Sequence, residues 1–443
     1  MYNVNVIIVV SNAFEGGENM QSIDIIQKSI DYIENNLKSD ITIDELAEMA
    51  NYSLYHYCRV FKSLTGLSVK CYINRRRLLY AAYEISQGRK IIDAALEYGF
   101  ETNSGFYKAF VKEFGYSPSE YFTMHIASRP YKINLLSEEH IMITQNKLRK
   151  VLENWNLQDE SISDCYHINT HKRSDNVWYV GDKYVIKVCT NEQGLKNNIA
   201  ISKSLIDRGL VCAVNVKTNS NDDYFTDGEL FFYVTERLNA QPIKSVDVYE
   251  NIQLAEKIGE AVGRLDLILE EYELICNEPN LLNDIDKLLS KVKSIMNLDT
   301  GFCKELKDKM MSFYPNLRKQ IIHRDTNLEN ILYDGDNLGF IDFDLTEKNI
   351  RIFDICYCAT SILSETFDKR EKWFDVYNAL IKGYERIVDL TDAERNAIPY
   401  LIFSIQMICI SYFISMEKYK ALAEININIL NWLIENKSRL FKN

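Results

Sequence analysis

The sequence predicts a multi-domain protein, in which an all-α domain with two helix-turn-helix units is followed by a two-lobed α+β domain. Three observations lead to this fold class. The chain has 443 residues, which is more than one hydrophobic core usually organises. Its first third contains two similar helical patterns, in which Phe61 and Phe110 hold matching places. Segments rich in β-forming residues begin only at about residue 176.

The composition is that of a soluble globular protein. Hydrophobic residues make up 47% and charged residues 26% of the chain, values that exclude a disordered or fibrous protein. The net charge of −12 argues against nucleic-acid binding over the whole surface, yet residues 51–90 carry many lysines and arginines and one acid, Glu84. The ten cysteines are scattered without paired CxxC spacing, so we expect reduced thiols and a cytoplasmic location.

Two apolar segments raise the question of a membrane. Residues 4–10 have no basic residue before them and no small-residue cleavage site after them, so they do not match a signal peptide. Residues 398–416 are long enough to span a bilayer, but they include Pro399 and several polar side chains and lack basic flanks. A buried helix is favoured, and no membrane partner is expected.

Residues 1–22 are expected to be an N-terminal extension. The peptide EGGENM, which ends at Met20, can be encoded so that a purine-rich element lies just upstream of an ATG codon. Our hypothesis is that translation begins at Met20 and that residues 1–19 are a start-site artefact. The intact mass of protein expressed from its own upstream DNA tests this hypothesis.

Residues 23–124 predict the helical domain. Apolar residues recur at helical spacing at its start, and Thr42 with Glu45 then forms a capping-box sequence. Ser53 can cap the next helix, and Gly66 can end it. A short helix, a turn and a capped helix form the helix-turn-helix pattern, whose second helix enters the major groove of DNA.

A second unit repeats this pattern. It has a turn at Gly99, a helix from about Asn103 and an end at Gly115. The helix between the two units carries the cluster Arg75–Arg77. This cluster suits either a solvated helix face or contacts with DNA phosphates.

An ordered set of residues across both units makes the pattern more specific: Leu46-Ala47, Ser53, Arg59, Phe61-Lys62, Thr65-Gly66, Tyr72, Arg77-Leu78, Ala81, Gly99-Phe100, Ser104, Phe106, Phe110, Lys112, Phe114-Gly115, Ser117-Pro118 and Tyr121. This set resembles the DNA-binding domain of AraC-type transcription regulators. The resemblance implies two helices that enter successive major-groove segments of DNA. The residues that their positions place toward DNA are Tyr55, His56 and Arg59 in the first unit and Asn103, Tyr107 and Lys108 in the second.

Residues 125–136 contain a proline and no clean periodicity, which predicts a linker. Residues 137–443 then form the second domain, with a small lobe at about 137–238 and a large lobe at about 239–443. A helix is expected at its start, followed by a strand hairpin that turns at Gly181. Lys187 lies in the second strand. After Lys187 we expect a helix, a pair of strands and a further strand that leads to a hinge. This order of elements is typical of a nucleotide-binding small lobe, in which the strand lysine binds phosphate oxygens.

The segment IIHRDTNLENILYDGDNLGFIDFD, residues 321–344, predicts phosphoryl-transfer chemistry. The carboxylate of Asp325 can orient and deprotonate an attacking hydroxyl group. Asn330 and Asp342 offer the hard oxygen ligands that Mg²⁺ prefers, and Mg²⁺ neutralises phosphate oxygens. Together with Lys187, these residues predict ATP and Mg²⁺ as cofactors.

Residues 137–443 resemble the aminoglycoside phosphotransferase family through the motifs YVIKV, IGEAVGRLD, IIHRDTNLENILYDG, FIDFD and RIFDICY. This family is a branch of the protein-kinase-like fold that also includes choline and homoserine kinases. The resemblance implies a catalytic base, Asp325; two magnesium ligands, Asn330 and Asp342; a phosphate-binding lysine, Lys187; and a structural aspartate, Asp354.

Spacing favours a small-molecule kinase over a protein kinase. Arg324 gives the HRD spelling of protein kinases, but the short stretch from Asp342 to Asp354 leaves no room for a long activation segment. The mostly helical residues 266–314 suggest an inserted region that shapes a small-molecule pocket.

Three departures from the family pattern leave activity open. The phosphate-covering turn at residues 169–176 lacks glycine, so Ser174 and Asn176 are its expected polar phosphate contacts. Asn198 stands where a glutamate would pair with the lysine, with Glu192 as a substitute, and Asp266 replaces a histidine.

Three functions therefore remain. The preferred one is a DNA-binding transcription regulator fused to an ATP- and magnesium-dependent phosphotransferase for a small hydroxyl compound, which would be aminoglycoside-, choline- or homoserine-like. The second is a regulator whose kinase-like domain senses a ligand without catalysis. The third is an antibiotic-inactivating enzyme whose DNA-binding part is incidental. The sequence does not indicate an oligomeric state.

Overall fold

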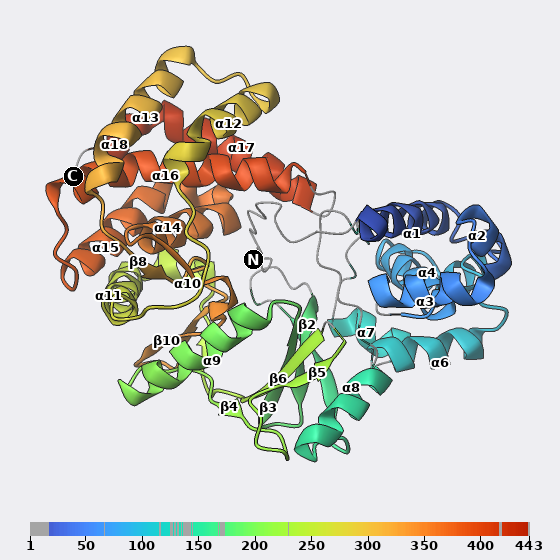
Figure 1. Ribbon diagram of the computed structural model, residues 1–443. Coiled ribbons are helices and arrows are strands. Elements are labelled where there is room, and N and C mark those ends of the chain that lie inside the picture. Colours follow the sequence, from blue (N-terminus) through green and yellow to red (C-terminus); the bar gives the residue numbers. More distant parts are fainter. Residues whose placement is uncertain are drawn as a thin grey trace.

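The structure, a computed structural model, describes residues 17–441 apart from residues 66, 115–116, most of 125–144, 167, 169–172, 229 and 416–418. It confirms the predicted fold class, because a helical region precedes an α+β domain (Figure 1). Most of the expected extension and linker, and the helix ends expected at Gly66 and Gly115, lie outside the described residues.

The N-terminal region consists of helices: α1 (Gly17–Asn35), α2 (Ile43–Met49), α3 (Leu54–Thr65), α4 (Val69–Ser86), α5 (Ile91–Glu97), α6 (Asn103–Phe114) and α7 (Pro118–Met124). The capping box at Thr42 and Glu45 forms as expected. Phe61 and Phe110 are both fully buried in one core that the two helix-turn-helix units share. α2 with α3 and α5 with α6 are therefore the two units.

The arginine cluster on α4 holds these helices together. Arg75 is buried and pairs with Glu113 of α6 at 2.6 Å, and Arg76 is buried and pairs with Glu34 of α1 at 2.6 Å. The half-buried Arg77 donates to main-chain carbonyls between α1 and α2. For Arg75 and Arg76, both expected alternatives are wrong, since neither side chain is solvated or open to a phosphate.

The small lobe is an antiparallel sheet with one helix before its first strand and another between its third and fourth strands. Its strands are β1 (Ile162–Tyr166), β2 (Arg173–Val180), β3 (Tyr184–Cys189), β4 (Asn215–Val216), β5 (Phe225–Asp227) and β6 (Leu230–Glu236). They pair in the order β1-β2-β3-β6-β4, with β5 also on β6. α8 (Gln145–Leu152) and η1 (Glu153–Trp155) precede the sheet, and α9 (Glu192–Asp207) follows β3. Gly181 makes the expected hairpin turn with φ of 55°.

The large lobe is mainly helical (Figure 1). Its helices are α10 (Ser245–Glu250), α11 (Ile252–Leu269), α12 (Leu281–Ile295), α13 (Thr300–Phe313), α14 (Phe353–Glu365), α15 (Trp373–Glu385), α16 (Asp392–Phe413), α17 (Lys420–Glu435) and α18 (Lys437–Leu440), with short 3-10 turns η2 (Tyr314–Asn316) and η4 (Phe367–Lys372). α12 and α13 supply the expected helical insertion.

One helix in the described part of the chain, α16, is long and apolar enough to cross a membrane by length and composition. In this structure 78% of its apolar window is buried inside the protein. It packs against α12, α13, α14 and α17. This placement agrees with the expected core helix.

Two small sheets carry the motif at residues 321–344. β8 (Lys319–Ile322) pairs with β11 (Glu347–Ile350), while β9 (Ile331–Tyr333) pairs with β10 (Leu338–Phe340) and with β7 (Gln241–Pro242). The turn η3 (Phe343–Leu345) lies between β10 and β11. Gly339 lets the Val211 carbonyl approach β10, because a Cβ at Gly339 would lie 2.0 Å from that oxygen. This close contact joins the segment after α9 to the motif.

Candidate active site

Asp354, in the first turn of α14, anchors the loop that follows β8. Its Oδ2 accepts the main-chain N–H of His323 at 2.7 Å, and its Oδ1 accepts that of Arg324 at 2.8 Å. Thr326 donates its hydroxyl to the Asp354 carbonyl at 2.6 Å. Arg324 has a left-handed backbone with φ of 78°, a conformation that needs such support. The loop is therefore held in one strained but well-supported shape.

The side chains of His323 and Arg324 point into the protein interior. The His323 ring donates from Nε2 to the Ile341 carbonyl at 3.1 Å, since a carbonyl can only accept, and it lies against Phe343. The Arg324 guanidinium pairs with Glu347 at 2.8 Å. Both residues thus connect the loop to β11 and η3.

Asp325 sits next in the loop, and donors surround its carboxylate. Asn327 donates to Oδ1 at 2.7 Å, Asn330 donates to Oδ2 at 3.0 Å, and the Tyr357 hydroxyl also hydrogen-bonds the carboxylate. Burial, together with the nearby charge of Asp342, raises the pKa of Asp325 to about 6. Such a group is charged at neutral pH and still accepts a proton readily.

The hairpin β9–β10 brings Asn330 and Asp342 together, because the N–H of Ile341 donates to the Asn330 carbonyl at 3.1 Å. Asn330 uses its Nδ2 on Asp325, which leaves its Oδ1 for another partner. The oxygen donors of Asn330 and Asp342 have the chemistry that Mg²⁺ requires. The residues present therefore fit a magnesium ion.

Lys187 reaches this hairpin from strand β3. Its Nζ lies 3.5 Å from Asp342 Oδ1. Burial by itself lowers the pKa of Lys187, but the carboxylates of Asp342 and Asp344 raise it above its ordinary value. The structure thus places a lysine cation beside Asp342, a residue that lies far from it in sequence.

Asn198 on α9 contacts the main chain instead of Lys187. Its Oδ1 accepts the N–H of Phe343 at 3.0 Å, and its Nδ2 donates to the Tyr233 hydroxyl at 3.3 Å. Glu192 pairs with Lys196 at 2.9 Å. α9 is therefore tied to η3 by an amide hydrogen bond at the place where the family pattern has a lysine–glutamate pair.

Asp266 on α11 lies behind the loop. It is 1% exposed and accepts the Tyr384 hydroxyl at 2.6 Å. Burial, and then the charge of the neighbouring Asp354, raises the pKa of Asp266 well above its usual range. The protonated carboxyl can donate to Asp354.

Ser174 and Asn176 lie on strand β2, where the Ser174 hydroxyl donates to Asn176 Oδ1 at 3.0 Å. The rest of the expected phosphate-covering turn, residues 169–172, lies outside the described residues.

Sequence reasoning missed two residues that contact Asp325. Asn327 lies two positions further along the same motif, and Tyr357 lies one helical turn after Asp354 on α14. The spacing of Tyr357 from Asp354 was a usable signal, because side chains three positions apart share a helix face.

The residues expected to face DNA lie on α3 and α6. Tyr55 is 80% exposed, and Arg59 and Asn103 are exposed as well. His56 is half-buried and packs edge-on against Tyr52, with Arg59 Nη2 3.4 Å from its Nδ1. In the second unit, Lys108 is exposed and Tyr107 is half-buried near Ser119.

Comparison with known proteins matches two separate parts of the chain to two different families. A family model described as "Helix-turn-helix domain" matches residues 46–124, and one described as "Phosphotransferase enzyme family" matches residues 168–387. The HTH-type transcriptional activator AarP of Providencia stuartii is 37% identical over 98 residues, which are 22% of this chain and 73% of AarP. The regulatory protein SoxS of Salmonella typhimurium is 35% identical over 98 residues, 22% of this chain and 92% of SoxS.

A longer match is the transcriptional regulator Rob of Salmonella typhimurium, which is 29% identical over 157 residues and 33% of this chain. The chain spans about half the length of Rob, 54%.

Two solved structures resemble the second domain. The amicoumacin kinase hAmiN, in complex with AMP-PNP, Ca²⁺ and Ami, has a TM-score of 0.50 at 17% identity over 65% of this chain and 93% of its own. A microcompartment-associated aminopropanol kinase has a TM-score of 0.50 at 13% identity over 66% of this chain and 98% of its own. These likenesses establish the kinase-like fold. The chain belongs to the AraC-type helix-turn-helix family through its first third, and its residues 168–387 match the model of the phosphotransferase enzyme family.

Proposed function

We propose that residues 23–124 bind DNA and that residues 137–443 bind ATP and Mg²⁺ and transfer a phosphoryl group to a hydroxyl of a small molecule. The observation that carries the proposal is the cluster of Asp325, Asn330, Asp342 and Lys187. It unites one oriented carboxylate, two oxygen donors for a metal and one cation. This combination suits Mg²⁺-dependent phosphoryl transfer. hAmiN, a kinase of similar fold, was solved with AMP-PNP, which supports a nucleotide as the donor.

In this mechanism Asp325 accepts the proton of the acceptor hydroxyl. Asn327 and Asn330 hold the carboxylate in place, and the pKa of about 6 keeps it ionised at neutral pH. Lys187 binds phosphate oxygens, and its pairing with Asp342 fixes its direction. Asn330 and Asp342 would hold Mg²⁺, which when bound neutralises the phosphate oxygens.

A substitution at Asp325 tests the proposal. We expect Asp325→Asn to lower phosphate transfer by about 10²-fold to 10⁴-fold, because the amide cannot take up the proton. Turnover is measured by coupled ATPase assay and phosphorylated-product detection with aminoglycosides, choline, homoserine and sugars as acceptors. Asp336→Asn, on the exposed β9–β10 turn, is the matched control. Equal activity in Asp325→Asn and wild-type protein would refute the catalytic role.

A second function, ligand sensing without turnover, has one observation in its favour. Asn198 hydrogen-bonds Phe343 at the place of the family's glutamate, and Glu192 pairs with Lys196. Lys187 is thus positioned through Asp342 and not through α9. Calorimetry that shows nucleotide binding, together with no turnover across the same acceptors, would favour sensing.

A further inference from the structure

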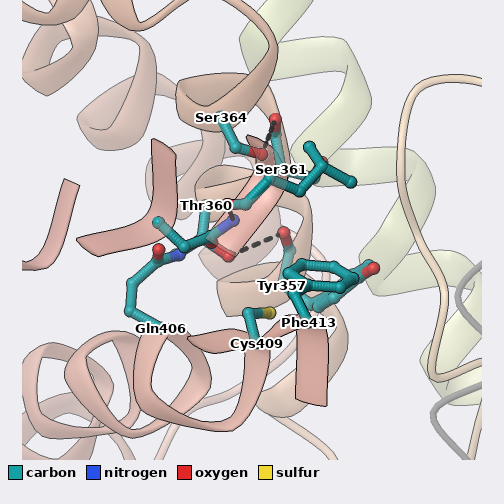
Figure 2. A pocket seen from close by; sticks show the side chains of 9 residues that line it. Tyr357, Thr360, Ser361, Ser364, Gln406, Cys409 and Phe413 are labelled. Carbon is teal, nitrogen blue, oxygen red and sulfur yellow. Dashed lines mark hydrogen bonds between the residues drawn. The ribbon is translucent and has the colours of Figure 1, made fainter. Parts of the chain in front are cut away.

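A small pocket lies between α14, α16 and α17 (Figure 2). The pocket is narrow, and the roughly 300 Å³ of empty space in it and around its mouth includes open solvent. The residues that line it are Tyr357, Thr360, Ser361, Ser364, Gln406, Cys409, Phe413, Leu422 and Asn426. Tyr357 connects the pocket to the proposed base, since its hydroxyl hydrogen-bonds Asp325. Tyr357 therefore contacts both the pocket and the proposed base, Asp325, which does not itself line the pocket.

The serine and threonine hydroxyls of the pocket are available to a ligand as hydrogen-bond acceptors. Thr360, Ser361 and Ser364 each donate their hydroxyl proton to a carbonyl of their own helix, at 3.0, 2.9 and 3.1 Å. Asn426 likewise donates one side-chain N–H to a main-chain carbonyl of α17 at 2.8 Å. A hydroxyl has one proton to donate, so lone pairs and a side-chain carbonyl remain for a ligand.

Gln406 adds the strongest indication that a ligand binds here. It is 1% exposed, and in the described part of the chain its Oε1 has no hydrogen-bond partner. Gln406 is drawn among the side chains that surround the pocket (Figure 2). A buried acceptor without a donor is unfavourable, and a ligand O–H or N–H would satisfy it.

The pocket also limits the charge of its ligand. Every lining residue is uncharged at neutral pH, and Cys409, Phe413 and Leu422 form an apolar side. An ammonium group would donate to the same oxygens, but no carboxylate among the lining residues would compensate its charge, and burial of an unpaired charge is costly. A hydroxyl or amide group avoids this cost, while C–H groups can cover the apolar side.

We propose that this pocket binds an uncharged, hydroxyl- or amide-bearing part of the acceptor, so that the domain prefers neutral polyhydroxy compounds to their ammonium counterparts. The inference rests on the proposed phosphotransferase function, because it names the substrate class of that same site. Gln406 is the residue that determines this specificity.

Two pairs of probes test the preference, glucose against glucosamine and glycerol against serinol. Each pair exchanges a hydroxyl for an ammonium group. Binding to the full chain is measured by titration calorimetry with AMP-PNP and Mg²⁺ present, so that it requires no turnover. We expect the neutral member of a pair to bind about tenfold more tightly, and Gln406→Leu to weaken that binding by about tenfold.

Gln406→Glu replaces the neutral amide at this position with a negatively charged carboxylate. It adds the missing carboxylate, so the preference within each pair should reverse in favour of the ammonium member. Gln253→Leu, at an exposed site on α11, is the control and should bind as the wild type does. Thermal melting of each variant verifies that it is folded.

The inference is wrong if the ammonium members bind the wild type as well as the neutral ones, if no member binds, or if the Gln406 variants leave the preference unchanged. Phosphate transfer is recorded separately on the same probes. Neutral binding without transfer would count against the proposed function alone, while transfer to the ammonium members only would count against this inference alone.

Discussion

At the scale of single residues, two buried carboxyl groups support the catalytic loop. Asp354 accepts the main-chain N–H groups of His323 and Arg324, and Asp266 lies behind it with the Tyr384 hydroxyl. The groups whose charges act on the pair include Arg351, which lowers the pKa of Asp266, and Glu347, which raises that of Asp354. Burial raises the pKa of Asp354 to about 6 and raises the pKa of Asp266 well above its usual range.

This pair predicts a stability that falls as pH rises. The raised pKa favours a protonated Asp266 in the folded protein, whereas an aspartate in the unfolded chain loses its proton at about pH 4. The folded state therefore binds more protons above that pH, so the free energy of unfolding decreases up to the folded pKa. Asp266→Asn keeps an N–H donor for Asp354 and removes the titration. We expect the stability of Asp266→Asn, relative to wild type, to increase as the pH rises above about 4, the pKa of an aspartate in the unfolded chain.

The measurement is denaturant unfolding followed by tryptophan fluorescence. All four tryptophans, Trp155, Trp178, Trp373 and Trp432, lie in the second domain, so the signal reports that domain. Asp308→Asn, at an exposed site on α13, is the control. If the free energy of unfolding depends on pH in the same way for Asp266→Asn and the wild type, Asp266 does not have a raised pKa in the folded protein.

At the scale of elements, two glycines let α11 and α15 touch along their backbones. A Cβ at Gly259 would lie 2.0 Å from the Leu380 carbonyl oxygen, and one at Gly383 would lie 2.0 Å from that of Glu256. Gly259 is the first glycine of the motif IGEAVGRLD. That glycine therefore serves helix packing, and α11 in turn carries Asp266 to its place behind the loop.

We expect Gly259→Ala to destabilise the domain by roughly 1–3 kcal/mol through overpacking. Alanine is the better helix former by about 1 kcal/mol, so a stabilising effect would show that the helices can separate without cost. Gly301→Ala on α13 is the comparison, because only the side chain of Asp299, which caps α13, and no helix backbone lies close there. Both are measured by the free energy of unfolding.

The elements also differ in how far they could be predicted from the sequence. Local signals such as the capping box at Thr42 and the hairpin at Gly181 formed as expected, because their chemistry lies within a few neighbouring residues. The burial of Arg75 and Arg76 was not predictable, because Glu113 and Glu34 lie far away in sequence and an arginine cluster on a helix usually faces solvent. In the sequence, Asn198 indicated only that the glutamate expected to pair with Lys187 is missing. The hydrogen bond from the Phe343 N–H to Asn198 could be seen only in the folded structure.

At the scale of the whole molecule, the domains have separate cores. One hydrophobic cluster holds the helix-turn-helix units, and others lie in the small and large lobes. The motif at residues 321–344 was recognisable because its functional side chains are close in sequence, whereas the approach of Lys187 to Asp342 depends on the packing of two lobes. The pocket at Gln406 was not foreseen, because it combines residues from three helices.

DNA binding gives the last prediction at this scale. Removal of residues 1–125 should abolish retention on fragments of the gene's own upstream DNA, because α3 and α6 carry the exposed Tyr55, Arg59 and Asn103. Within the full chain, Arg59→Ala should weaken binding and, if Arg59 contacts a phosphate, reduce the slope of log affinity against log salt by about 1. Arg264→Ala, at an exposed site on α11, should leave both quantities unchanged. Gel-shift titrations over a range of salt concentrations measure them, and DNA retention by residues 126–443 alone would overturn the assignment of this function to the helix-turn-helix units.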